Sequence, residues 1–112
     1  MRKNNIPLLK ARFEYWRANG LDTPDVYLAM ADDSAIPTLL TADDAEEQSD
    51  VSRKALEMRR VRGQEPPFMK LGRREVRYPR TEFFRWLASR YVAPREPRRP
   101  AADEYTQVRT TA

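Results

Sequence analysis

Few residue types in this chain could carry enzyme chemistry. Its 112 residues include no histidine and no cysteine, which excludes histidine-based triads, thiol nucleophiles and the usual zinc centres. The pattern closest to a metal site is a run of four carboxylates, Asp43, Asp44, Glu46 and Glu47. Their spacing on one short helix is more typical of a capped, solvated helix surface. We therefore predict no catalytic residue, no metal site and no cofactor.

The distribution of charge indicates a polyanionic partner. Residues 1–50 carry five basic and ten acidic side chains, whereas residues 51–112 carry sixteen basic and seven acidic ones. A basic surface confined to one half of a chain is typical of nucleic-acid binding, and a solvated surface without a ligand is the alternative. No apolar run is long enough for a signal peptide or a membrane span. The absence of cysteine fits a reducing cytosol, so we expect a cytoplasmic protein that does not bind membranes.

One cluster of candidate DNA-contacting residues belongs to a predicted helix over residues 53–62. With Leu56 as the inward reference, steps of about 100° per residue place Lys54, Glu57, Met58 and Val61 outward. Basic side chains at the start of such a helix are able to read guanine edges or hold phosphates, and Glu57 is able to accept from a cytosine amino group or orient an arginine. A solvated basic helix face is the alternative. The candidates are Ser52, Arg53, Lys54, Glu57, Met58 and Arg60.

A second cluster belongs to a predicted β-hairpin with strands over residues 68–71 and 75–78. Arg73 and Arg74 lie at its tip, where an arginine can follow the phosphate backbone or enter a narrow minor groove. A charged hairpin tip without a ligand is the alternative. The candidates are Lys70, Gly72, Arg73, Arg74 and Arg77.

Periodicity and capping residues predict the helices and strands that position these clusters. Residues 1–35 predict a helical hairpin, with helices over 8–19 and from about Thr23, the expected N-cap, to residue 31. Residues 36–40 are extended, Thr41 caps a helix to residue 48, and Ser52 caps the next one. A last helix over 80–92 carries aromatic residues at core spacing. Residues 93–112, rich in proline and arginine at their start, predict a disordered tail.

In residues and in element order, the segment from Leu39 to Val92 resembles the excisionase and MerR-like family of winged helix-turn-helix proteins. Five blocks carry the resemblance: Leu40–Ala45, Val51–Leu56, Gly63 with Pro66–Arg74, Val76–Tyr78 and Trp86-Leu87. The resemblance implies a mainly α fold with a small β-hairpin, in which 36–92 form a winged helix-turn-helix DNA-binding domain. It also implies a recognition helix over 53–62, a wing at residues 70–77, and a bacterial, DNA-associated protein.

The chain departs from the family pattern at two places. Gln48, Ser49 and Asp50 stand where the family has an apolar pair and a glycine, and Arg59 replaces a bulky apolar residue. Either the second helix is rotated, or the N-terminal hairpin supplies apolar surface through Leu9, Phe13 and Trp16. The hairpin can pack on its own domain or on a neighbouring copy. The split between acidic front and basic back favours the neighbouring copy, and hence head-to-tail self-association on DNA.

Three functions remain open at this point. The first is an excisionase, or recombination directionality factor, of a mobile element, which binds repeated sites on double-stranded DNA and assists a site-specific recombinase. The second is a transcriptional regulator of a phage or integrated-element operon with the same fold. The third is a protein-interaction adaptor whose basic surfaces bind an acidic partner.

Overall fold

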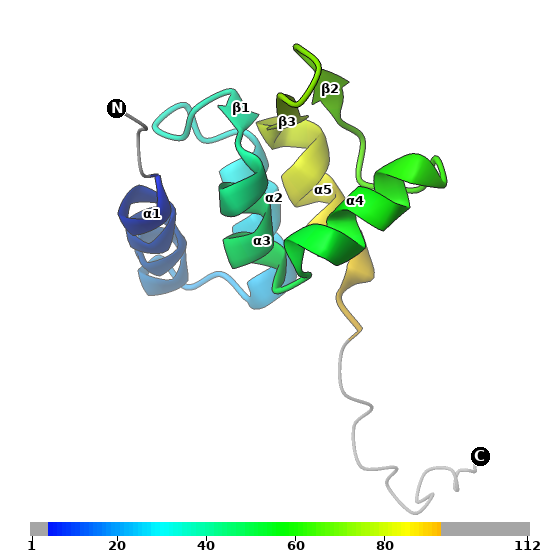
Figure 1. Ribbon diagram of the computed structural model, residues 1–112. Coiled ribbons are helices and arrows are strands. Elements are labelled where there is room, and N and C mark those ends of the chain that lie inside the picture. The colour runs from blue at the N-terminus through cyan, green and yellow to red at the C-terminus, as the bar shows by residue number, and fades with distance from the viewer. Residues whose placement is uncertain (1–4, 93–112) are drawn as a thin grey trace, which may run out of the picture.

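The computed structural model describes residues 5–92 and shows a mainly helical chain with a small antiparallel sheet. In chain order, its elements are α1 (Ile6–Ala18), α2 (Thr23–Ala31), β1 (Leu39–Leu40), α3 (Ala42–Ser49), α4 (Arg53–Val61), β2 (Met69–Lys70), β3 (Val76–Pro79) and α5 (Arg80–Arg90). Figure 1 shows α1 on one side of the molecule and α4 on the other, with α2, α3 and α5 between them. The predicted tail lies outside the described residues.

The sheet has one strand more than the predicted hairpin. Strand β3 is central, in the order β1-β3-β2, and pairs antiparallel with both neighbours. Met69 lies opposite Arg77 in the hairpin, and Leu40 lies opposite Tyr78 on the other side. The segment before α3 was expected only to be extended, and its last two residues form β1. Its pairing ties the entry of α3 to the hairpin through β3, and β2 forms an edge of the sheet.

The caps that open α3 and α4 are confirmed. The Thr41 hydroxyl accepts from the Asp44 backbone N–H at 3.1 Å, and the Asp44 carboxylate accepts from the Thr41 N–H at 3.0 Å, which completes a capping box. The Ser52 hydroxyl accepts from the Ala55 N–H at 3.1 Å. Asp44 at the start of α3 therefore has a structural role as a helix cap, and this role requires no metal ion.

Helix ends follow the sequence with small corrections. Helix α1 begins at Ile6 rather than residue 8, because a proline is tolerated in the first turn and Asn5 serves as the N-cap residue. Asp22, not Thr23, is the N-cap residue of α2. Gly63 follows α4 with φ +68°, a left-handed conformation that glycine adopts without strain. Asp50 adopts the same region at φ 59° in the turn after α3.

The N-terminal hairpin packs on its own chain, so its expected docking on a neighbouring copy is wrong for the residues that form this core. Leu9 of α1 and Val26 and Met30 of α2 are fully buried. They belong to one hydrophobic cluster with residues of the sheet, α4 and α5. The Tyr27 ring of α2 stacks on Phe84 of α5 with centroids 6.2 Å apart. The apolar surface that α3 lacks is therefore supplied in cis.

A buried carboxylate joins α1 to the segment that follows α2. Asp33 accepts from Arg12 Nε at 2.7 Å and from Trp16 Nε1 at 2.9 Å, and its other oxygen accepts from the Ala35 N–H at 2.9 Å. Burial alone raises the pKa of Asp33. The hydrogen bonds and the Arg12 charge outweigh burial, so the pKa lies below its ordinary value of 3.8.

Two polar residues at places where apolar residues were expected, Arg59 and Ser49, make specific contacts. Arg59 places its guanidinium over the Trp86 ring, 5.5 Å from the centroid, and its Nε donates to the Glu65 carbonyl at 2.7 Å. The arginine therefore covers an aromatic residue of the core. The Ser49 hydroxyl donates to the Ala45 carbonyl at 2.7 Å and accepts from the Val51 N–H at 3.1 Å. These bonds shape the turn between α3 and α4.

Candidate nucleic-acid interface

Helix α4 presents the predicted face to solvent. Leu56 is fully buried, whereas Lys54 and Glu57 are exposed, as are Met58 and Val61. The inward reference and the outward set predicted from helical geometry are therefore confirmed. The turn after α3 and the Ser52 cap fix where α4 begins, so its first basic residues, Arg53 and Lys54, lie at its exposed N-terminal end.

The β2–β3 hairpin projects beside α4 and carries the second basic cluster. Residues 71–75 form the loop of this hairpin, which Figure 1 shows standing out from the body of the molecule. Lys70, Arg73 and Arg74 are exposed there. The Leu71 N–H donates to the Glu75 carbonyl at 2.8 Å and closes the loop. Gly72 has no left-handed φ, and a Cβ there would meet Glu75 only at 3.8 Å, so the turn does not require glycine.

A groove separates α4 from this hairpin, and both predicted clusters contribute to it. Its volume is about 510 Å³, and basic side chains from both elements line it: Arg60, Lys70, Arg73 and Arg74. Glu57 is the acidic residue on its wall, and Val61, Phe68 and Val76 supply apolar surface. We call this the α4–hairpin groove. Its charge and its width between two exposed elements suit a strand of polyanion better than an apolar small molecule.

A second hollow of about 280 Å³ lies between the hairpin and the start of α3. Arg53, Arg60, Arg74 and Arg77 line it together with two carboxylates, Asp43 and Glu75. Arg77 is half-buried and donates to the Val76 carbonyl at 3.0 Å, so its side chain runs along β3. Of the predicted hairpin residues, Arg77 therefore faces the second hollow, and Lys70 and Arg73 face the groove.

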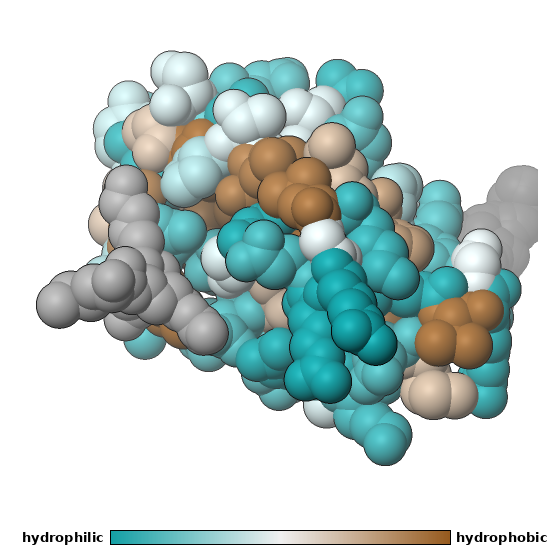
Figure 2. Space-filling view, turned by 45° about the horizontal axis from the view of Figure 1, so that its top comes forward, coloured by the Kyte–Doolittle hydropathy of each residue, from teal (hydrophilic) through white to brown (hydrophobic). Residues whose placement is uncertain are grey.

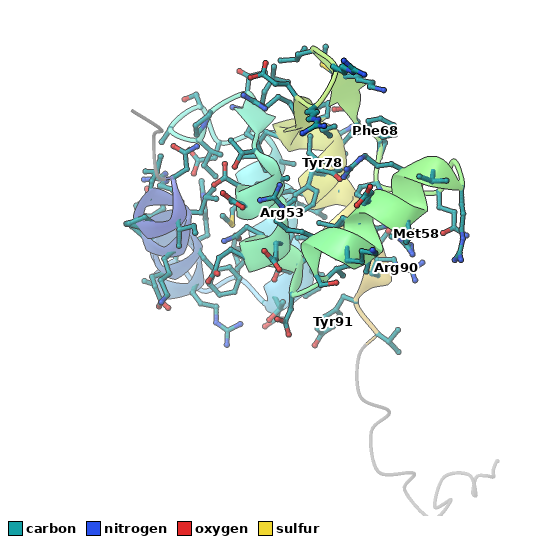
Figure 3. All side chains as sticks on the ribbon, in the orientation of Figure 1. Arg53, Met58, Phe68, Tyr78, Arg90 and Tyr91 are labelled. Atoms are coloured by element: carbon teal, nitrogen blue, oxygen red, sulfur yellow. The ribbon has the colours of Figure 1, made fainter. Side chains whose placement is uncertain are left out.

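Arg53 is held by α3 rather than free at the helix start. Its guanidinium lies 2.8 Å from an Asp43 carboxylate oxygen, and its backbone N–H donates to Glu46 at 3.3 Å. Figure 3 shows the Arg53 side chain reaching toward α3. The side chain keeps 58% exposure, so the pair is open to solvent and to a competing phosphate. Two of the acidic residues at α3 thus orient the first residue of α4.

Arg60 lies between α4 and the sheet instead of on the outward face. It is half-buried, and its Nη1 donates to the Tyr78 hydroxyl at 2.6 Å. Its guanidinium carbon lies 5.8 Å from the centroid of the Phe68 ring. Figure 3 labels Phe68 and Tyr78 on the hairpin side of α4. Sequence reasoning counted Arg60 among the candidate DNA-contacting residues, although its position four residues after Leu56 puts it near the inward direction.

The sequence analysis did not identify three residues that shape this surface. Asp43 was assigned to a solvated surface, Tyr78 to the return strand, and Phe68 to the entry of the hairpin. Their contacts with Arg53 and Arg60 are long-range and leave no periodic signal in the sequence. The face brought forward in Figure 2 is mostly hydrophilic, with separate hydrophobic patches. Exposed apolar residues on α4 and near β2 include Val61, Met69 and Leu71.

Comparison of the chain with protein-family models, curated proteins and solved structures gives no match. Within residues 5–92, no helix has the length and apolar character needed to cross a membrane.

Proposed function

We propose that this protein binds duplex DNA with α4 as the recognition helix and the β2–β3 hairpin as a wing. The observation that carries the proposal is the α4–hairpin groove, because basic side chains of both elements meet there. The proposal is supported by a resemblance of residues to the excisionase and MerR-like family, and by the order of helix, turn, helix, hairpin and helix that this family uses.

The dimensions of α4 suit a major groove. An α-helix with its side chains is about 10–12 Å across, and a B-DNA major groove about 12 Å wide admits it. Lys54 and Glu57 then face base edges, and Met58 offers an apolar contact to a thymine methyl group. Arg73 and Arg74 reach the backbone or the adjacent minor groove. Arg53 holds a phosphate once Asp43 releases it, and Ser52 presents its backbone N–H to the same strand.

For the biological role, we propose an excisionase that binds repeated sites of a mobile element and assists a recombinase. One such module buries a modest interface with DNA, so several copies in a row would be needed for tight binding. Within residues 5–92 the helices are short and the N-terminal hairpin is used in the core of its own chain, so these residues offer no coiled-coil dimerisation segment. That supports assembly on tandem DNA sites over a ligand-sensing dimer. Footprinting distinguishes this role from that of a transcriptional regulator. A regulator would protect promoters and leave the attachment sites of the element unprotected.

The test compares charge variants for binding to a labelled duplex library. The double variant Arg73→Ala, Arg74→Ala should weaken binding evenly across sequences. Lys54→Ala should cost about 1–3 kcal/mol and relax preference at particular base pairs. The double variant Arg85→Ala, Arg90→Ala is the matched control, because both arginines are exposed on α5 and neither lines the groove.

The proposal makes the exposed face of α4 and the hairpin, and not the total charge, responsible for binding. Equal losses in the α5 control and in the hairpin variant would contradict it. Binding to an acidic protein with no binding to duplex DNA would favour the adaptor instead.

A further inference from the structure

Few polar contacts hold α4 against the sheet. Within residues 5–92, one hydrogen bond joins α4 to the sheet, and it runs from Arg60 to Tyr78. The segment between α4 and β2 spans residues 62–68 and contributes the Arg59 bond to Glu65. Arg60 is therefore the polar link between α4 and the sheet, beside the apolar packing of Leu56 in the core.

Tyr78 provides a fixed point for Arg60. The tyrosine is fully buried on the central strand, and its ring packs on Phe83 of α5 with centroids 5.9 Å apart. Its hydroxyl accepts from a guanidinium, and a hydrogen bond with a charged partner is stronger than a neutral one. Phe68, at the entry of β2, lies on the other side of the contact and presents its ring to the guanidinium.

Arg60 also lines both hollows of the candidate interface, as do Arg74 and Val76. It therefore lies at the boundary between them, beneath the space that separates α4 from the hairpin. A long side chain anchored at its tip acts there as a spacer between the two elements.

We propose that Arg60 is a positioning residue, which acts through Tyr78 and Phe68 to hold the hairpin at a fixed spacing from α4. That spacing determines whether both elements engage one duplex at the same time. Because the geometry is set before binding, the ordering cost at the interface is reduced. The DNA part of this proposal rests on the proposed function, whereas the fixed spacing is a property of the free protein.

The spacing can be measured without DNA. The chain has no cysteine, so spin labels attach only at introduced ones. Arg62→Cys and Leu71→Cys place one exposed spin label at the end of α4 and one on the hairpin. Double electron–electron resonance then measures the distribution of distances between the two labels. Tyr78→Phe removes the hydroxyl and keeps the ring, and should broaden the distribution. Tyr27→Phe is the matched control, because its ring packs against Phe84 away from the groove.

A second variant, at Arg60, tests whether the broadening comes from loss of the Arg60–Tyr78 contact or only from the change at Tyr78. Arg60→Met keeps an unbranched side chain without the guanidinium and should broaden the distribution in the same way. Circular dichroism verifies that each variant is folded. If Arg60→Met is unfolded, the distance distribution of Tyr78→Phe alone tests the proposal. An unchanged distribution in Tyr78→Phe, or equal broadening in Tyr27→Phe, overturns the proposal.

With DNA, the same variant should separate the two contacts. Tyr78→Phe should weaken binding by about tenfold, which corresponds to one hydrogen bond with a charged group at a half-buried site. Hydroxyl-radical footprinting should show loss of protection under the hairpin, with base preference under α4 retained. Loss of both together would indicate a structural role only and would contradict the positioning role. If the wild-type protein binds no duplex, the proposed function fails, and the label distances still decide the positioning role.

Discussion

Asp33→Asn tests how much one buried carboxylate, which ties α1 to the segment after α2, stabilises the N-terminal hairpin. The wild-type side chain is 5% exposed and accepts hydrogen bonds from Arg12, Trp16 and Ala35. Asparagine keeps the shape and one acceptor oxygen but removes the negative charge that Arg12 faces. Breaking a fully buried ion pair costs about 3–5 kcal/mol. The Arg12 side chain keeps 25% exposure, so water compensates part of the loss.

We therefore expect Asp33→Asn to lower the free energy of unfolding by about 1–2 kcal/mol at pH 7. Urea denaturation followed by circular dichroism measures it. Asp32→Asn is the matched control, because this neighbour is 72% exposed and lies 3.9 Å from Arg85. A surface pair of this kind contributes little, so the control should change stability by less than about 0.5 kcal/mol.

The same comparison has a defined pH dependence. The folded-state pKa of Asp33 lies below its ordinary value of 3.8, so the unfolded state binds the proton more readily. The stability from this group is fully present above that ordinary pKa and is lost as the pH falls through the folded-state pKa. The gap between wild type and Asp33→Asn should thus be constant near neutrality and shrink in acid. A gap that stays constant into acid, or an equal effect in the Asp32 control, would refute the reasoning.

Three further predictions concern the fold. Deleting residues 1–34 should leave a chain without cooperative thermal unfolding, because it removes buried core residues; a stable, cooperative fragment would contradict cis packing. Gly63→Ala should cost about 1 kcal/mol in denaturation experiments, since its φ of +68° strains a residue with a Cβ. Arg59→Ala should cost about 1 kcal/mol by loss of its contact with Trp86, and no change in the urea midpoint would argue against that contact.

Local features of the fold could be predicted from the sequence because local chemistry determines them. Thr41 and Ser52 are good N-cap residues, and both accept the expected backbone hydrogen bond. Leu56 was the natural inward residue of its helix, and it is fully buried. The basic residues of α4 and of the hairpin were identified by type and spacing, and several of them line one groove.

Features that depend on distant contacts could not be predicted. The pairing of β1 with β3 involves two residues of a short segment, too few to show strand periodicity. Asp33 binds Arg12 and Trp16, which lie 21 and 17 positions earlier in the sequence. The residues next to Asp33 in the sequence give no signal of these contacts. The choice between cis and trans packing depends on which surface covers the hairpin. The charge split of the chain favoured a neighbouring copy, but burial of Leu9 and Met30 in the chain's own core outweighs it.

The inward turn of Arg60 is a different case, because the helical geometry contained the signal. Its position four residues after Leu56 places it near the inward direction, yet an arginine is seldom expected there. The Tyr78 hydroxyl and the Phe68 ring are what make the position acceptable. Charge type alone therefore overestimates how many basic residues of α4 face outward.

The salt dependence of duplex binding tests the central claim most directly. Fluorescence anisotropy of a labelled duplex, titrated at several salt concentrations, gives the slope of log affinity against log salt. The account predicts contacts with about four to six phosphates per protomer and hence a slope of roughly −4 to −5. A slope near zero, or no binding at low salt, would contradict DNA binding by this protein.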